Sequence, residues 1–397
     1  MDRMDNRLER YLDVLKTHHN YRTLKPGMPG EGAVVQRDGR HLINFSSNDY
    51  LGLARNPALV ARAREWTEKW GVGSTASRLV CGTLELHERV ESKLAALKGT
   101  KAALIFNSGY QANSTILPAL FDRKVLGTNA LVFTDRLVHA SIHDGCRGAG
   151  VRQIRFRHND MNHLEALLKI NADKSGIRFI LTETVFSMDG DRADLAALIE
   201  LAERFGAFLY VDEAHATGVF GPKGMGLAGN YPGKIDLIMG TFSKALGSFG
   251  AYVACSDRLK EYFVNRCSGF IYSTALPPGV LGAMDAALDL VPTLGDERRR
   301  LRAHSARLRK ALNAAGIDTA GSTTQIVPAV IGAEEAVLAA SHHIENRGIL
   351  GIAIRPPTVP AGTSRIRFAV TADHKPEDMD HLLDLIPDIA ALSRASS

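Results

Sequence analysis

The chain has 397 residues, of which 45% are hydrophobic and 23% are charged, a balance typical of a globular protein with a large core. Its length favours two domains. The formal net charge of +5, spread over the whole chain, is too small to indicate binding to nucleic acid or to an anionic membrane surface.

The cysteines and the N-terminus indicate the cellular compartment. The four cysteines show no spacing typical of a metal site, and their scatter suits a reducing compartment. The opening residues, MDRMDNRLERYLDVLK, mix both signs of charge and lack the apolar centre of a signal peptide. No apolar run approaches the roughly 18 residues that a membrane span needs. We therefore expect a cytoplasmic protein with no membrane segment and no nucleic-acid partner.

Residues 1–44 are predicted to form an N-terminal helix and an arm. Between Leu8 and Leu15, apolar residues recur at positions i, i+3, i+4 and i+7, which indicates an amphipathic helix. Residues 20–44 are polar and marked by glycine and proline, so we expect them to join this helix to the main body.

Residues 45–290 are predicted to form a large α/β domain. Helical stretches alternate with short β-rich runs, and several of these runs are continuously apolar, as in strands buried on both faces. This alternation predicts a mostly parallel sheet of seven strands. The predicted strands are AALIFN (102–107), ALVFTD (130–135), RQIRF (152–156), RFILTE (178–183), AFLYVDE (207–213), DLIMGT (236–241) and GAYVAC (250–255).

Residues 291–397 are predicted to form a smaller α+β domain. A long basic helix at 296–315 comes first, and the near-helical spacing of its leucines makes its arginines a solvated face. A last helix begins at Pro376. The strand-like segments between them are QIVPAVIG (325–332), GIAIRPP (351–357) and SRIRFAV (364–370).

Polar residues follow five of the predicted strands of the large domain. In an open α/β sheet, ligands bind beyond the carboxyl ends of the strands. The loops found there are rich in Gly, Ser, Thr, His, Asp and Lys, which predicts a site built from several loops. They are NSGYQAN (107–113), DRLVHASIHDG (135–145), ETVFSMDGD (183–191), DEAHATG (212–218) and TFSKALG (241–247).

Lys244 is the only cation between Lys234 and Arg258. Its neighbours are small, hydroxylic or aromatic, and apolar runs lie on both sides. Two interpretations remain open from these residues alone. Lys244 is either an ordinary surface lysine or an amine whose lowered pKa lets it attack a carbonyl.

The letters DEAH at 212–215 resemble a helicase box, but no phosphate-binding loop of the form G-x-x-x-x-G-K-[ST] precedes them. We therefore exclude a nucleotide hydrolase. Asp212 and His215 remain at the end of a predicted strand. Either they are a loop cap and a satisfied core histidine, or a buried carboxylate here holds a proton on a heterocyclic nitrogen.

His139 and His143 have the i, i+4 spacing of a metal pair on a helix. Because no third ligand stands nearby, we expect no metal, and His139 could instead stack on an aromatic ligand. Ser108, Gly109 and Tyr110 precede a helical stretch, whose first backbone N–H groups suit a phosphate.

Two arginines alternate with apolar residues in RPPTVPAGTSRIRFAV (355–370). This period of two places Arg365 and Arg367 on one face of a strand. They are either solvated arginines of an edge strand or a fixed fork that binds a carboxylate.

Five segments together resemble the α-oxoamine synthases, fold-type I enzymes that depend on pyridoxal 5′-phosphate (PLP). They occur in the order of that family, and the resemblance extends from about residue 5 to residue 390. The segments are NFSSNDYLGL (44–53), FSMDGD (186–191), DEAHATG (212–218), the Lys244 loop and RPPTVPAGTSRIR (355–367). The resemblance implies a large PLP-binding domain with a mostly parallel seven-stranded sheet and a smaller C-terminal α+β domain.

The resemblance also implies roles for single residues. Lys244 would bind the cofactor covalently and act as the catalytic base, and Asp212 would pair with the pyridinium nitrogen. His139 would stack on the cofactor ring and donate to a substrate oxygen. His215 and Ser187 would hydrogen-bond near the 3′-oxygen of the cofactor. Lys244, His139, Asp212 and His215 form the implied catalytic group.

The phosphate side of the cofactor is assigned to another set of residues. The resemblance places Ser108, Gly109, Tyr110 and Thr241 there. It implies that Thr274, in the segment IYSTALPP, reaches the phosphate of a neighbouring subunit. The expected assembly is therefore a homodimer with active sites at the interface.

Arg22, Asn48, Thr358 and Arg367 are implied to contact the substrates, with Arg367 on the carboxylate of the amino acid. The segment IRPPTVPAGTSR resembles the branch of the family that condenses L-alanine with a pimeloyl thioester, carried on coenzyme A or on a carrier protein. Branches that make aminoketobutyrate, aminolevulinate or a sphingoid base remain alternatives within the family. A non-catalytic PLP-binding protein is the alternative outside it.

Overall fold

The computed structural model describes residues 2–18 and 20–394, which fall into two compact units. The central unit comprises residues 48–187 and 192–299, and the terminal unit comprises the described residues of 1–47, 188–191 and 300–397. No helix within the described residues is both long enough and apolar enough to span a membrane.

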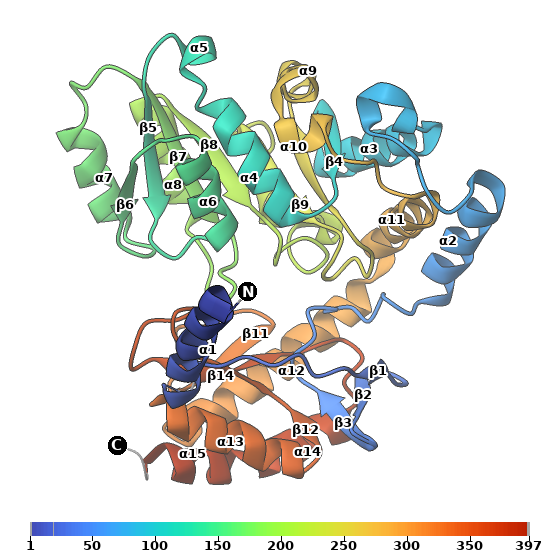
Figure 1. Ribbon diagram of the computed structural model, residues 1–397, viewed down its shortest axis with the longest axis vertical. Helices are drawn as coiled ribbons and strands as arrows, with labels where there is room; N and C mark the ends of the chain where they lie inside the picture. Colours follow the sequence, from blue (N-terminus) through green and yellow to red (C-terminus); the bar gives the residue numbers. More distant parts are fainter. Residues whose placement is uncertain (1, 19, 395–397) are drawn as a thin grey trace. The chain divides into compact units, whose positions relative to one another are not determined.

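The central unit is built on a seven-stranded sheet in the order β4-β10-β9-β8-β7-β5-β6 (Figure 1). Only β10 runs antiparallel to its neighbours, so the predicted mostly parallel α/β sheet is confirmed. The strands are β4 (Ala102–Phe106), β5 (Ala130–Asp135), β6 (Gln153–Phe156), β7 (Ile177–Glu183), β8 (Ala207–Asp212), β9 (Leu237–Thr241) and β10 (Ala251–Cys255).

Helices cover both faces of this sheet (Figure 1). β4, β9 and β10 are buried at every position, which explains why their sequences are continuously apolar. α4 and α6 pack together over one face, in a core that includes Ile116, Ile142 and Tyr210. The helices are α2 (Pro57–Trp70), α3 (Glu85–Lys98), α4 (Gly109–Leu120), α5 (Arg123–Leu126), α6 (Ala140–Gly148), α7 (Met161–Ile170), α8 (Leu195–Phe205), α9 (Asp257–Arg266), α10 (Ser268–Ile271) and α11 (Pro278–Leu290).

The terminal unit has two small sheets, with strand orders β1-β2-β3-β12 and β11-β14-β13. α12 (Gly295–Ala314) begins in the central unit and ends in the terminal unit. The strands are β1 (Met28–Pro29), β2 (Val34–Arg37), β3 (Arg40–Asn44), β11 (Ile326–Gly332), β12 (Ile349–Leu350), β13 (Ile352–Ile354) and β14 (Ser364–Ala369). The remaining helices are α1 (Asp2–Thr17), α13 (Glu334–Asn346), α14 (Pro376–Asp384) and α15 (Ile386–Arg394).

β14 is the middle strand of its sheet, which rules out the edge-strand interpretation of its arginines. Arg365 and Arg367 are only 5% and 7% exposed. The Arg365 guanidinium forms an ion pair with Asp189, and its Nε donates to the carbonyl of Thr363 at 2.9 Å. Burial with a carboxylate partner explains how an arginine is tolerated at this position.

Residues 188–191 belong to the terminal unit although the chain on both sides belongs to the central unit. The carbonyl of Gly190 accepts hydrogen bonds from Thr323 N at 3.0 Å and from Thr324 Oγ1 at 2.7 Å. Gly190 has φ +70°, and a Cβ there would lie 2.0 Å from the carbonyl oxygen of Ile326. Only glycine fits this approach, so the segment FSMDGD is fixed by backbone contacts as well as by the Asp189–Arg365 pair.

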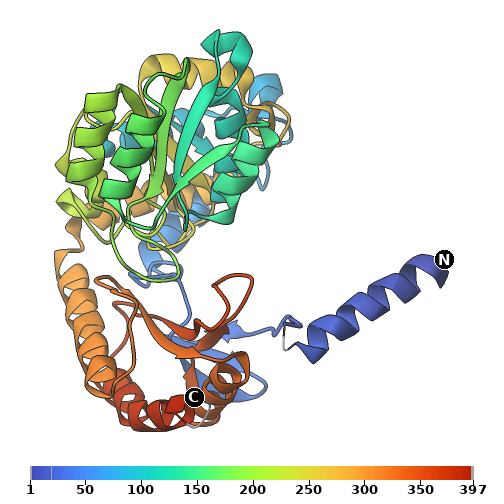
Figure 2. The same ribbon diagram turned by 90° about the vertical axis from the view of Figure 1, so that its left-hand side faces the viewer.

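α1 forms at the predicted position and exposes its apolar side chains, including Leu8 (51% exposed) and Tyr11 (62% exposed). Figure 2 shows the helix standing away from the sheets of its unit. Exposed apolar residues in a row mark an interaction surface in soluble proteins.

Candidate active site

The four predicted catalytic residues, Lys244, His139, Asp212 and His215, lie at or just after the carboxyl ends of strands of the central sheet. Parallel strands present their carboxyl ends together, and β5, β7, β8 and β9 end at Asp135, Glu183, Asp212 and Thr241. His139 and Lys244 follow β5 and β9 by a few residues, and α4 begins just after β4. The sheet therefore collects side chains that are far apart in the sequence.

Asp212 is buried, 4% exposed, at the end of β8. Its Oδ1 accepts from Ala214 N at 2.9 Å, and its Oδ2 accepts from Asn113 Nδ2 at 3.2 Å. These two donors fix the orientation of the carboxylate. Asp212 is therefore suited to hold a positive charge on a ligand, as the second interpretation of DEAH proposed.

Glu183 is a second buried carboxyl group, which the sequence did not single out. It pairs in register with Asp212, and neighbouring strands lie about 4.8 Å apart, so the two side chains share one face of the sheet. Its Oε1 has no hydrogen-bond partner among the residues that the structure describes. Burial raises the pKa of Glu183 well above its usual range, and the charge of Asp212 raises it further. The fold therefore favours the protonated form of Glu183 more than the unfolded chain does.

We expect Glu183→Gln to raise the unfolding free energy of the cofactor-free protein at pH 8 and to change it little at pH 4.5. The glutamate ionises near pH 4.3 in the unfolded chain, and the raised pKa means that it ionises at a higher pH in the fold. Above about pH 4.3 the folded state therefore binds more protons than the unfolded state, and it loses stability as the pH rises further. Glutamine has the same shape and cannot ionise.

Urea unfolding at the two pH values measures this difference. Glu200→Gln is the matched control, because the side chain of Glu200 is 73% exposed on α8. An equal stability change at both pH values for Glu183→Gln would show that Glu183 is already ionised in the fold.

Lys244 lies in a tight loop after β9 and is half-buried. Thr241 Oγ1 donates to the carbonyl of Gly250 at 2.8 Å and accepts from Ser243 N at 3.1 Å. The charge of Lys244 lowers the pKa of Glu183 and of His139, although burial is the larger influence on both. Lys244 follows β9, which neighbours β8 in the sheet, and therefore lies at the sheet edge that holds Asp212.

His139 is the N-cap residue of α6, so it does not share that helix with His143 as the metal-pair spacing assumed. Its Nδ1 accepts from Ser141 N at 3.2 Å and lies 2.7 Å from Ser141 Oγ. His143 Nδ1 lies 2.8 Å from Gln153 Oε1, and its Nε2 lies 3.1 Å from Arg155 Nη2. The two imidazoles therefore have separate sets of partners.

His215 is buried and contacts Tyr50, which lies in NFSSNDYLGL. The Tyr50 hydroxyl lies 2.7 Å from His215 Nδ1 and donates to Asn48 Oδ1 at 3.0 Å. The structure thus joins two predicted site residues, His215 and Asn48, through a tyrosine that sequence reasoning missed. A hydroxyl that both donates and accepts fixes the orientation of the two partners.

The predicted phosphate side lies at the start of α4. Ser108 is the N-cap, and its Oγ accepts from Gln111 N at 3.1 Å. Gly109 and Tyr110 begin the helix, so their N–H groups have no acceptor within it. The hydroxyl of Thr241 is engaged within the lysine loop, and the neighbouring Ser243 is exposed. Ser243 is a further candidate for contacting the phosphate, which the sequence did not indicate.

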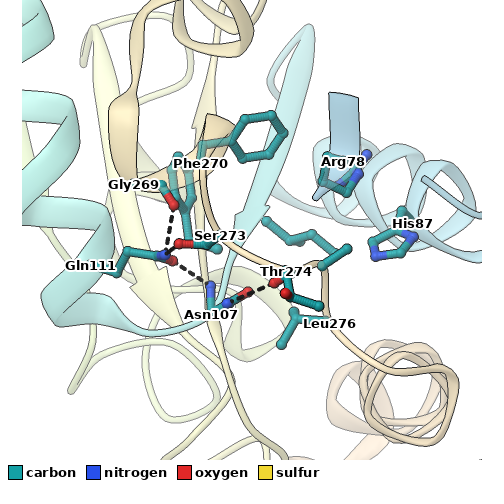
Figure 3. Close-up of a pocket in the computed structure, with 12 residues that line it drawn as sticks. Arg78, His87, Asn107, Gln111, Gly269, Phe270, Ser273, Thr274 and Leu276 are labelled. Atoms are coloured by element: carbon teal, nitrogen blue, oxygen red, sulfur yellow. Dashed lines mark hydrogen bonds between the residues drawn. The ribbon is translucent and has the colours of Figure 1, made fainter. Parts of the chain in front are cut away.

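Thr274 is exposed on the central unit and is one of the residues that line a small pocket (Figure 3). Asn107 Nδ2 donates to the carbonyl of Thr274 at 3.0 Å, and Gln111 Nε2 donates to Gly269 O and to Ser273 Oγ at 2.7 and 2.8 Å. The pocket has a volume of about 10 Å³, enough for one water molecule. These contacts position Thr274.

The other predicted residues lie partly in the terminal unit. Arg22 Nη2 donates to Thr358 Oγ1 at 3.3 Å, so two predicted substrate residues meet although their positions in the chain are far apart. Both line a pocket of about 790 Å³ within that unit. Arg367 is buried on β14, and Ser187 is half-buried after β7.

A buried ion pair supports the loop that follows Asp212. Lys98 Nζ lies 2.6 Å from Glu213 Oε2, and their side chains are 1% and 0% exposed. Glu213 Oε1 accepts from Ala228 N at 2.8 Å, and Lys98 also donates to the carbonyl of Met225 at 2.6 Å. These bonds fix the chain from residue 213 to residue 228.

We expect Lys98→Met to lower the unfolding free energy by about 3–5 kcal/mol, because Glu213 would stay buried without its partner. Lys234→Met is the matched control. Lys234 pairs with Glu203 at the similar distance of 2.7 Å, but these side chains are 55% and 56% exposed. The control should change stability by less than about 1 kcal/mol. Equal losses in urea unfolding of the two variants would contradict this role.

Comparison with known proteins gives the family. The family model described as "Aminotransferase class I and II" matches residues 40–386. An 8-amino-7-oxononanoate synthase of Gluconacetobacter diazotrophicus is 56% identical over 98% of both chains. A candidate 8-amino-7-oxononanoate synthase of Bordetella pertussis is 63% identical over 88% of both chains.

Solved structures agree with this result. A serine palmitoyltransferase from S. paucimobilis, solved with bound PLP and myriocin, has a TM-score of 0.91 and 28% sequence identity, and each chain is covered completely. The fold-type I architecture expected from the resemblance is therefore confirmed. The chain belongs to the aminotransferase class I and II family of PLP-dependent enzymes and, within it, to the α-oxoamine synthases.

Proposed function

We propose that this chain condenses L-alanine with a pimeloyl thioester and releases CO₂ and a free thiol, which gives 8-amino-7-oxononanoate for biotin synthesis. The observation that carries this proposal is the 56% identity, over 98% of both chains, to the synthase of Gluconacetobacter diazotrophicus. The carbon count agrees: alanine keeps two carbons after decarboxylation, and the pimeloyl group supplies seven of the nine.

The side chains of the central unit have the chemistry that PLP needs. Asp212 offers a buried carboxylate to the pyridine nitrogen, and Lys244 offers an amine. His139 offers an imidazole at the same sheet edge. The start of α4 at Gly109 and Tyr110 offers backbone N–H groups to the phosphate. PLP, when bound, supplies an electron sink for the charge that develops on the α-carbon of the amino acid.

The chain contributes proton transfer and orientation. Asp212 would keep a proton on the pyridine nitrogen, because a neighbouring negative charge favours the protonated form. Lys244 would take the α-proton of alanine as the general base. His139 would donate a hydrogen bond to the thioester oxygen as negative charge develops there, a role worth about 3–4 kcal/mol.

Three of the residues proposed to contact the substrates, Arg22, Thr358 and Arg367, belong to the terminal unit. Arg367 would bind the carboxylate of the amino acid. The pocket that contains Arg22 and Thr358 is lined both by cations, including Lys25 and Arg355, and by apolar side chains such as Ile354. Such a lining suits an acyl chain that ends in a carboxylate and a thioester carrier that bears phosphate.

A homodimer forms part of the proposal, with Thr274 reaching the cofactor of the partner subunit. Exposed apolar side chains on the central unit support it, since Val72 is 85% exposed and Tyr272 is 84% exposed. Ser77 pairs with Thr274 in a short β-bridge. This bridge links the segment that carries Val72 to the segment that carries Tyr272. Light scattering of the purified protein tests the assembly, and a monomeric mass would contradict it.

Substrate preference tests the proposed reaction. Purified enzyme is assayed for thiol release with alanine, glycine or serine against pimeloyl, acetyl, succinyl and palmitoyl thioesters, on coenzyme A and on a carrier protein. We expect turnover with alanine and a pimeloyl donor. Preference for serine with palmitoyl thioester would instead support the activity named for the solved relative. Bound PLP without α-proton exchange in any amino acid would indicate a non-catalytic protein.

A further inference from the structure

A series of hydrogen-bonded, buried side chains connects Asp212 to the exposed His139 within the central unit. Tyr210 and Asp212 lie on β8, Asn113 lies on α4, and Ser141 lies on α6. Figure 1 shows α4 and α6 side by side, and their packing brings these residues together. Tyr210, Asn113 and Ser141 are 0% exposed. Because these three side chains are closed to solvent, their polar atoms depend on other protein groups for hydrogen bonds.

The orientation of the Asn113 amide follows from its neighbours. Asn113 Nδ2 lies 3.2 Å from Asp212 Oδ2 and 2.9 Å from Ser141 Oγ. A carboxylate can only accept, so the atom that faces Asp212 must be the NH₂ group. Asn113 Oδ1 then accepts from the Tyr210 hydroxyl. Burial raises the pKa of Tyr210 well above its usual range, which keeps the hydroxyl protonated as a donor.

The direction of these bonds continues through Ser141. Its Oγ accepts from Asn113, so its single proton is free to point at His139 Nδ1, 2.7 Å away. Ser141 N also donates to the same Nδ1 at 3.2 Å. Two donors thus converge on one imidazole nitrogen, and that nitrogen must be unprotonated to accept them.

The remaining ring nitrogen therefore carries the proton. Partial burial lowers the pKa of His139, and the charge of Lys244 lowers it further against the opposing charge of Asp212. A neutral imidazole has one proton, and with Nδ1 unprotonated it lies on Nε2.

We propose that Asn113 is a positioning residue that acts through Ser141 to set the tautomer of His139, so that Nε2–H is a fixed hydrogen-bond donor in the active site. Under the proposed function, on which the catalytic part of this inference rests, the donor faces the thioester oxygen. Asp212 then has a second task, because its carboxylate fixes the orientation of the Asn113 amide.

Nitrogen-15 resonances of histidine measure the tautomer directly. The protein is labelled at histidine, and the His139 signals are assigned by their loss in His139→Gln. In the cofactor-free protein and in the PLP-bound enzyme, we expect the Nδ1 signal of an unprotonated nitrogen and the Nε2 signal of a protonated one. A proton on Nδ1 in the wild-type protein would overturn the proposal.

Asn113→Leu removes the amide at nearly constant volume, and Asn171→Leu is its matched control. Asn171 is also buried, but its amide donates to the backbone carbonyl of Leu167 at 2.7 Å. We expect a mixed His139 tautomer in Asn113→Leu, with kcat lowered by about 10–100-fold and KM for alanine little changed. The control should keep the wild-type tautomer and kcat.

Ser141→Ala is a second variant, in case Asn113→Leu does not fold. It removes the Oγ donor and leaves the backbone donor, so the expected shift in tautomer is smaller. Buried Ser305, whose Oγ donates to the Leu301 carbonyl, provides the matched Ser305→Ala control. An unchanged tautomer, or a changed tautomer with unchanged kcat, would overturn the proposed positioning role of Asn113 and Ser141. Inactivity of the wild type with alanine and pimeloyl donors would contradict the proposed function, while the nitrogen signals would still report the tautomer.

Discussion

Lys244→Ala is expected to lower kcat by about 10³-fold or more and to remove the absorption of lysine-bound PLP. The variant loses both the covalent attachment of the cofactor and the base that takes the α-proton, and general base catalysis alone contributes about 10²–10⁴-fold. The half-buried position of Lys244 at the sheet edge that holds Asp212 leads to this expectation.

Two further measurements sharpen this test. Lys234→Ala is the control, because Lys234 is exposed and its ion pair with Glu203 lies on the surface. Added methylamine should restore part of the turnover of Lys244→Ala if a missing base causes the loss. Wild-type turnover in Lys244→Ala, or a lysine-bound spectrum in that variant, would show that another residue has this role.

Asp212→Asn is expected to lower kcat by about 10³-fold while the protein stays folded. Asparagine has the same shape but no charge, so it no longer favours a proton on the pyridine nitrogen. The amide of the new asparagine can also turn its NH₂ group toward Asn113 Nδ2, which is itself a donor. This would break the hydrogen bond that Asn113 Nδ2 now makes at 3.2 Å. The histidine signals and the cofactor absorption should therefore change together.

Asp236→Asn is the control for this variant. Asp236 also accepts a backbone hydrogen bond, from Leu209 N at 2.7 Å, but it lies just before β9, at the opposite end of the same strands. We expect its kcat to stay within about twofold of the wild type, since charges there are a strand length away from the site. Equal losses in both aspartate variants would indicate a general effect on folding.

The sequence predicted the strands of the central sheet well, because residues buried on both faces leave an unbroken apolar run. β5 has the predicted bounds, and β9 and β10 each begin one residue later than predicted. The loops after these strands could be selected because the carboxyl ends of parallel strands form ligand sites. The roles given to Lys244, Asp212 and His139 stay predictions.

Contacts between distant segments could not be read from the sequence. Glu183 faces Asp212 only because β7 and β8 pair in one register. Tyr50 meets His215, and Lys98 meets Glu213, through packing that no local pattern encodes. The solvated interpretation of Arg365 and Arg367 was wrong for the same reason, since strand order decides whether a strand is central. Alternation of residues gives the face of a side chain but not what covers that face.

The parallel pairing of β3 with β12 has a consequence for how the chain folds during synthesis. Ile43 pairs with Ile349, so the small sheet formed by the first strands stays incomplete until most of the chain has left the ribosome. The central unit depends mainly on strands from Ala102 to Cys255 and can fold earlier. Through this interval β1, β2 and β3 can pair with one another, but β3 lacks its partner β12. The polar, glycine- and proline-marked composition of residues 20–44 then serves a second purpose, because it disfavours aggregation of this segment before β12 is made.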